Sequence, residues 1–189
     1  MAKQKGNVVI HGLSGKIGDL LIFRQVGGKT VVSKVPEQPK TKKVSDKQKA
    51  YRKRFQQATL YAKIAVGTPD TKELYDKKAN KRSGKTAYHV AIADFLHAPD
   101  IHTVDLSQYT GAAGDEIRIE VSDDFAVKSV HVQITNADGS LVEEGDAVNS
   151  AGFLWIYAAT QNNESLTGDR ILVTASDLPG NITTDERSI

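Results

Sequence analysis

The hydrophobic pattern of this 189-residue chain changes its period near Pro99. In the longest patterned stretch before Pro99, apolar residues recur every three or four positions, as in a helix with one buried face. After Pro99 they alternate with polar residues, as in strands that bury one face of a sheet. The two patterns in succession predict an α+β chain of two domains, residues 1–98 and residues 99–189.

The charge of the chain changes sign at the same place. Residues 1–100 hold 21 Lys or Arg and 8 Asp or Glu, a net charge of +13. Residues 101–189 hold 4 and 15, a net charge of −11. The formal net charge of +2 is therefore the sum of two large opposite charges, which predicts that each half contacts a partner of complementary charge.

The basic half is predicted to contain a β-hairpin and two or three helices. Two β-forming stretches flank Gly27-Gly28, a loop that allows the positive φ angles of a tight turn, so we expect a hairpin over residues 20–35. The polar, proline-broken segment 36–43 is expected to be an extended arm. Ser45 and Gln48 have the spacing of a capping box, which predicts a helix over residues 46–66. A short helix over 71–79 and an apolar helix over 86–96 follow.

The helix over residues 46–66 carries apolar residues on two sides. Leu60 and Ile64 lie opposite the main apolar stripe, and basic residues occupy another face. We therefore expect its C-terminal half to be buried on two sides, either in a layered core or against another subunit. The stripe consists of Tyr51, Phe55, Ala58, Ala62 and Val66, and the basic face of Lys49, Arg52, Lys53 and Lys63.

The acidic half is predicted to be an antiparallel β-sandwich. Alternating stretches predict strands near residues 117–121, 130–134, 153–157 and 171–175, with Phe153, Trp155 and Tyr157 on one face. This half resembles bacterial immunoglobulin-like or fibronectin-like modules over about residues 115–184, and the resemblance implies an immunoglobulin-like sandwich. The chain departs from that pattern because it has no Cys for an immunoglobulin-type disulfide. The matching residues are Val130-His131-Val132-Gln133-Ile134, Asp138-Gly139, Gly145, Trp155, Tyr157, Gly168-Asp169, Ile171, Val173, Ala175, Asp177 and Gly180-Asn181.

The first 65 residues carry a second resemblance. The matching positions are Gly15-Lys16-Ile17-Gly18-Asp19-Leu20, Gly27-Gly28-Lys29, and the helix start Ser45, Gln48, Arg52 and Phe55. On these residues the segment resembles a group of uncharacterised bacterial and phage-associated proteins, a domain of unknown function. The resemblance implies no activity, only an association with phage or phage-like structural genes.

Two sets of motifs suggest nucleotide chemistry, and neither has the required spacing. Gly28-Lys29-Thr30 and Gly84-Lys85-Thr86 resemble part of a phosphate-binding loop, but Phe23 and Ala79 occupy the positions where that loop needs Gly. His11, Gly12, Gly15 and Gly18 do not match a dinucleotide fingerprint, so we interpret these glycines as turn residues. No catalytic and no cofactor-binding residue is predicted.

Two groups of residues contain the side chains that metal ions bind. His89, Asp94, His97, Asp100 and His102 lack the ligand spacing of a zinc site, so surface histidines are the preferred interpretation. Asp123-Asp124 and Glu143-Glu144-Gly145-Asp146 could bind calcium through clustered carboxylates, but an acidic loop rim is preferred. No metal ligand and no cofactor is predicted.

The basic residues define the candidate site. They are interpreted first as a surface for homo-oligomerisation or a larger protein assembly, second as a nucleic-acid interface within residues 40–85, and otherwise as a solvated face. A sugar- or surface-binding role for Trp155 is weaker, because Trp155 belongs to the apolar set. The candidates are Lys42, Lys43, Lys49, Arg52, Lys53, Arg54, Phe55, Leu60, Ile64, Lys77, Lys81 and Arg82.

The sequence shows no apolar run long enough to span a membrane and no signal-peptide core. We therefore expect synthesis in the cytoplasm. Together with the absence of an enzyme motif, these features predict a non-enzymatic structural protein, a subunit of a virion, a phage-tail-like particle or another ordered assembly, in which case its destination is that particle.

Overall fold

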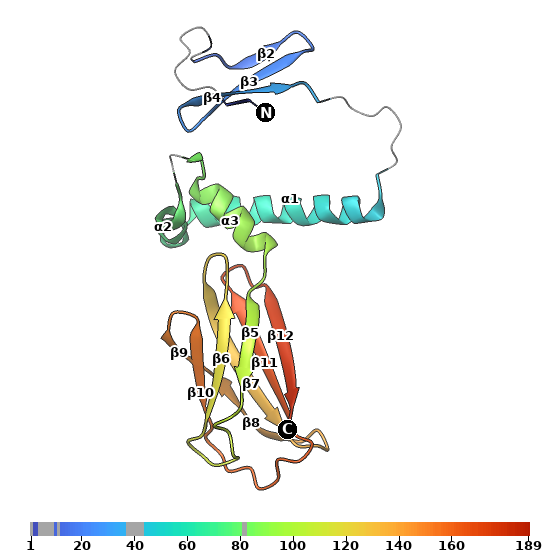
Figure 1. The fold of residues 1–189 in the computed structure, drawn as a ribbon, viewed down its shortest axis with the longest axis vertical. Helices are drawn as coiled ribbons and strands as arrows, with labels where there is room; N and C mark the ends of the chain where they lie inside the picture. Colours follow the sequence, from blue (N-terminus) through green and yellow to red (C-terminus); the bar gives the residue numbers. More distant parts are fainter. Residues whose placement is uncertain (1, 4–9, 11, 37–43, 81–82) are drawn as a thin grey trace. The chain divides into compact units, whose positions relative to one another are not determined.

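A computed structural model describes residues 2–3, 10, 12–36, 44–80 and 83–189 (Figure 1). These residues form a mixed α+β structure with three helices and three antiparallel sheets. The chain divides into two compact units, Met1–Ala91 and Ile92–Ile189. The division lies inside the third helix, before the sequence boundary predicted at Pro99. Most of the predicted arm, residues 37–43, lies outside the described residues.

The first sheet is built around the predicted hairpin. Its strands β1 (Ala2–Lys3), β2 (Gly15–Ile17), β3 (Leu21–Val26) and β4 (Lys29–Lys34) lie in the order β1-β4-β3-β2. Gly27 and Gly28 connect β3 to β4 with φ angles of 56° and 74°, so the hairpin prediction is confirmed. Both glycines adopt the left-handed conformation that the tight turn requires and that other residues rarely adopt.

Three helices follow this sheet along the chain: α1 (Asp46–Gly67), α2 (Pro69–Lys78) and α3 (Ala87–Leu96). The capping box at the start of α1 is present: the Gln48 backbone N–H donates to Ser45 Oγ, and the Ser45 backbone N–H donates to Gln48 Oε1. The hydroxyls of Tyr61 and Tyr75 are hydrogen-bonded at 2.7 Å and tie α1 to α2. The predicted helices over 46–66, 71–79 and 86–96 are confirmed with small shifts in their bounds.

The second unit has two antiparallel sheets around one core. One contains β5 (Asp100–Asp105), β6 (Glu116–Ser122), β10 (Leu154–Ala158) and β9 (Val148–Ala151), in the order β5-β6-β10-β9. The other contains β12 (Ile182–Ser188), β11 (Arg170–Asp177), β7 (Val127–Thr135) and β8 (Leu141–Asp146), in the order β12-β11-β7-β8. Figure 1 shows the two sheets facing each other.

Alternate residues from both sheets fill this core, as their period-2 pattern predicts. Ile117 and Ile119 of one sheet and Val132 and Val173 of the other are fully buried in a single cluster. One residue departs from the prediction: Phe153 does not join Trp155 and Tyr157 on the core face. It lies before β10, outside the regular alternation, and its side chain is exposed.

Candidate functional site

Helix α1 exposes large apolar side chains. Leu60 and Ile64, one turn apart on the same side, are 62% and 63% exposed. Only the side of the helix that carries Ala58, Ala62 and Ala65 is buried. Within the described residues the second side is therefore not buried in a layered core, and burial against another subunit is the alternative that stays a prediction. A second side remains available to a partner.

The first turns of α1 are exposed as well. Tyr51 and Phe55, predicted to belong to the buried stripe, are exposed, because every buried residue of α1 lies in its second half. Together with Arg52 and Gln56 they line a shallow hollow of about 410 Å³. The N-terminal turns of α1 thus combine aromatic surface with positive charge.

Some of the basic candidates on α1 form ion pairs with described residues, and others do not. Arg52, Lys53 and Arg54 are exposed and form no ion pair with any described residue. Lys49 Nζ lies 3.0 Å from Asp46 Oδ1, and on α2 Lys77 Nζ lies 3.3 Å from Glu73 Oε1. The structure therefore gathers the candidates from Lys49 to Ile64 on one helix. The candidates Lys42, Lys43, Lys81 and Arg82 lie outside the described residues.

The second unit carries the opposite charge. Residues 92–189 hold 4 Lys or Arg and 17 Asp or Glu, a net charge of −13. Nine of the 17 acidic side chains are exposed, among them Glu120, Glu144 and Glu186 on strands. Exposed charge of one sign attracts a surface of the other sign and steers its approach.

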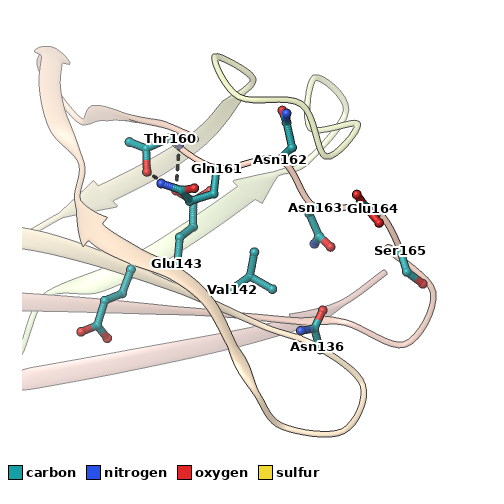
Figure 2. A pocket seen from close by; sticks show the side chains of 10 residues that line it. Asn136, Val142, Glu143, Thr160, Gln161, Asn162, Asn163, Glu164 and Ser165 are labelled. Carbon is teal, nitrogen blue, oxygen red and sulfur yellow. Dashed lines mark hydrogen bonds between the residues drawn. The ribbon is translucent and has the colours of Figure 1, made fainter.

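A polar hollow of about 650 Å³ lies between β8 and the loop 160–165. Figure 2 shows this loop passing over Val142 and Asn136, with the Asn163 side chain directed toward them. The Glu143 carboxylate is buried beside it. Glu143 Oε2 accepts hydrogen bonds from the backbone N–H and the hydroxyl of Thr160, both at 2.7 Å.

These hydrogen bonds give Glu143 a structural role. Its other oxygen, Oε1, is shielded from solvent and has no hydrogen-bond partner among the described residues. The carboxylate therefore ties the loop to β8. Glu144, the next residue, has its side chain on the other side of β8, where it accepts from Gln133 Nε2 at 3.0 Å.

Three aspartates, Asp94, Asp123 and Asp177, converge in the second unit, with one carboxylate oxygen of each within 4.8 Å of the others. Such spacing suits the oxygen ligands of a hard cation. Two of these carboxylates already accept hydrogen bonds from backbone N–H groups. Asp177 Oδ1 accepts from the N–H groups of Gly180 and Asn181, and Asp123 Oδ2 from those of Phe125 and Ala126. Sequence reasoning missed this grouping because the three residues are far apart in the chain and share no spacing signal.

His89, His97 and His102, the histidines of the candidate zinc group, do not converge on one point. His89 Nδ1 is hydrogen-bonded to the Thr86 hydroxyl at the start of α3, and His102 Nε2 to the Ser122 hydroxyl. His97 pairs with Asp124. Separate partners of this kind are consistent with surface histidines, the preferred interpretation.

No helix among the described residues is long and apolar enough to cross a membrane. Comparison of the chain with family models, with curated proteins and with solved structures finds no match.

Proposed function

We propose that this chain is a non-enzymatic assembly protein whose helix α1 binds the acidic unit of a second copy. The carrying observation is that Leu60 and Ile64 are exposed on a helix whose Arg52, Lys53, Arg54 and Lys63 form no ion pair with any described residue. Large apolar side chains exposed together on one face are typical of an interaction surface. The proposed assembly is a virion, a phage-tail-like particle or another ordered particle.

Charge complementarity favours a second copy as the occupant. The α1 surface is basic, and residues 92–189 carry a net charge of −13 on the same chain. A contact between unlike surfaces of identical chains is heterologous, so it propagates into a ring or a filament. Such propagation is what a structural subunit requires.

We further propose that the acidic half is an immunoglobulin-like sandwich. Its strand orders support this. If β5 to β12 are renamed A, B, C, C′, D, E, F and G, the sheets read A-B-E-D and G-F-C-C′. The immunoglobulin fold pairs its strands as A-B-E-D and C-F-G. The additional strand after C is β8.

The assembly proposal is tested by sedimentation velocity and electron microscopy of the full chain at low and high salt. We expect concentration-dependent assembly at low salt that weakens at high salt, because salt screens exposed charges. Changing Leu60 and Ile64 together to Ser should abolish it. The control is Ile17→Ser, which removes a comparably exposed apolar side chain from β2. A protein that stays monomeric at high concentration and low salt would contradict the proposal.

A second candidate function is binding of a nucleic-acid backbone. It is favoured by the three consecutive cations Arg52, Lys53 and Arg54, which form no ion pair within the part of the chain that the structure describes. Each phosphate contact releases counterions, so affinity for DNA or RNA should fall steeply with salt. The measurement is binding of the full chain to single- and double-stranded oligonucleotides at about 50 mM salt, with Arg52, Lys53 and Arg54 changed to Ala in a comparison variant. Absence of binding by the unchanged chain would eliminate this function, and equal binding by both proteins would show that Arg52, Lys53 and Arg54 do not carry it.

A further inference from the structure

The outer face of the sheet β5-β6-β10-β9 has an apolar region. Trp155 and Tyr157 of β10 pack against the core, so the alternate residues Leu154 and Ile156 lie on the opposite face. In the register of the sheet, Ile156 pairs with Val148 of β9. We call Val148, Leu154 and Ile156 the outer apolar patch.

This patch is accessible and unusual for an outward face. Val148 is 72% exposed, and Leu154 and Ile156 are partly exposed. Outward positions of a solvated sheet normally carry polar side chains. The exposed Phe153 precedes β10 and adds apolar surface at the turn between β9 and β10.

An unpaired carboxylate borders the patch. In the register of β6 and β10, Glu120 pairs with Leu154 and Arg118 with Ile156. Arg118 is neutralised, because its Nη2 lies 3.1 Å from Glu116 Oε2. Glu120 is exposed and forms no ion pair with any described residue. The patch therefore has an apolar centre and a negative border.

Helix α1 has the complementary arrangement. Leu60, Lys63 and Ile64 lie on one side of it, at the three- and four-residue spacing of a helix face. Lys63 is exposed and, like Glu120, has no ion pair within the described part of the chain. This face has an apolar pair beside one positive charge.

From this match we infer that the outer apolar patch is the surface on which α1 of a second copy docks. Leu60 and Ile64 then cover Val148, Leu154 and Ile156, and Lys63 approaches Glu120. The inference rests on the proposed assembly function and names the receiving surface on the acidic unit.

Two other contacts at this surface are less favourable. Two patches facing each other bring the Glu120 carboxylates of both copies together, and like charges across an interface are destabilising. Extension of the sheet at the edge strand β9 is opposed by the shift in register between Leu154 and Trp155, since a bulge disrupts edge pairing.

Cysteine trapping tests the inference directly, because the chain contains no Cys. Full-length Ile64→Cys and Val148→Cys proteins are mixed and oxidised, and disulfide-linked peptides are counted by mass spectrometry. A disulfide requires Cα atoms within about 7 Å, so only docked surfaces are captured. We expect the mixed pair in several-fold excess over either self-pair. The control replaces Val148→Cys with Ile182→Cys on β12, where the side chain is 63% exposed.

The outcomes separate this inference from the proposed function. Trapping no stronger than with Ile182→Cys, or a dominant Val148→Cys self-pair, would overturn the inference while assembly in sedimentation could still be observed. A protein that neither assembles nor cross-links would overturn both.

Charge exchange provides an independent measurement on the full chain. Lys63→Glu and Glu120→Lys should each weaken assembly several-fold, and a protein carrying both changes should recover it, because the ion pair is restored in reversed order. Failure of the double variant to recover any assembly, when each single change weakens it, would also overturn the inference.

Discussion

The hydroxyl of Tyr157 donates a hydrogen bond to the carboxylate of Glu143 at 3.0 Å in the interior of the second unit. Glu143 also accepts both hydrogen bonds from Thr160, so one carboxylate joins β8, β10 and the loop that follows β10. Burial of the Tyr157 ring, together with its hydrogen bond to Glu143, raises the pKa of the Tyr157 hydroxyl well above its ordinary value.

Tyr157→Phe should lower the free energy of unfolding by about 1–2 kcal/mol, because a buried carboxylate loses one of its three donors. The measurement is urea unfolding followed by the fluorescence of Trp155, the only Trp in the chain. Tyr51→Phe, on the exposed side of α1, serves as the control and should change little. Unchanged stability of the Tyr157 variant would show that the hydrogen bond contributes nothing net.

Gly111→Ala should destabilise the second unit by about 3 kcal/mol. Gly111 has a φ of +92°, and an added Cβ would lie 2.6 Å from the backbone oxygen of Asn163. Gly114 is the matched control, since its φ is +97° but nothing lies within 4 Å of an added Cβ. Gly114→Ala should therefore cost only the backbone strain, about 1–2 kcal/mol. Equal losses in the two variants would contradict the predicted steric clash.

The stability of the second unit should fall in acid partly through Asp115. Hydrogen bonds from Thr110 and from the Ala112 backbone N–H hold the pKa of Asp115 below its ordinary value of 3.8. This contribution is present above pH 3.8 and is lost as the pH falls through the lower pKa of the folded state.

Asp115→Asn should therefore reduce stability at neutral pH and flatten its decline in acid. Unfolding in urea at a series of pH values down to below 3.8 measures this. The exposed Glu164→Gln is the comparison change in the same unit. An unaltered pH profile for the Asp115 variant would argue against the assignment.

Asn181 should anchor the end of α3 to the second unit. Its side-chain amide shares its two protons among the carbonyl oxygens of Asp94, Phe95 and His97, at 3.0–3.2 Å, and Asp177 Oδ2. Asn181→Ala leaves those carbonyls without this donor, at a cost of about 1–3 kcal/mol. Faster amide hydrogen exchange near residues 94–97 is the specific readout. Asn149→Ala, which removes an exposed amide, should not accelerate exchange there.

Local elements could be predicted because short-range chemistry determines them. The capping box of Ser45 and Gln48 and the glycine pair at residues 27 and 28 act within a few residues, and both predictions are confirmed. The strands β5, β8, β9 and β12 were not predicted. All four lie at sheet edges, and β9 is exposed along its whole length, so its residues lack the alternation that a buried face imposes.

The sequence by itself determined the places of the three helices, the hairpin, the alternating core strands and the opposite charges of the two halves, since these depend on neighbouring residues or on composition. Only the tertiary structure decided that Leu60 and Ile64 are exposed and that Phe153 lies outside the core. It also decided that Glu143 accepts hydrogen bonds from Tyr157 and Thr160. Those outcomes depend on which segments pack together. Contacts between residues far apart in the chain leave no periodic trace in the sequence, because chain folding and not spacing brings them within reach.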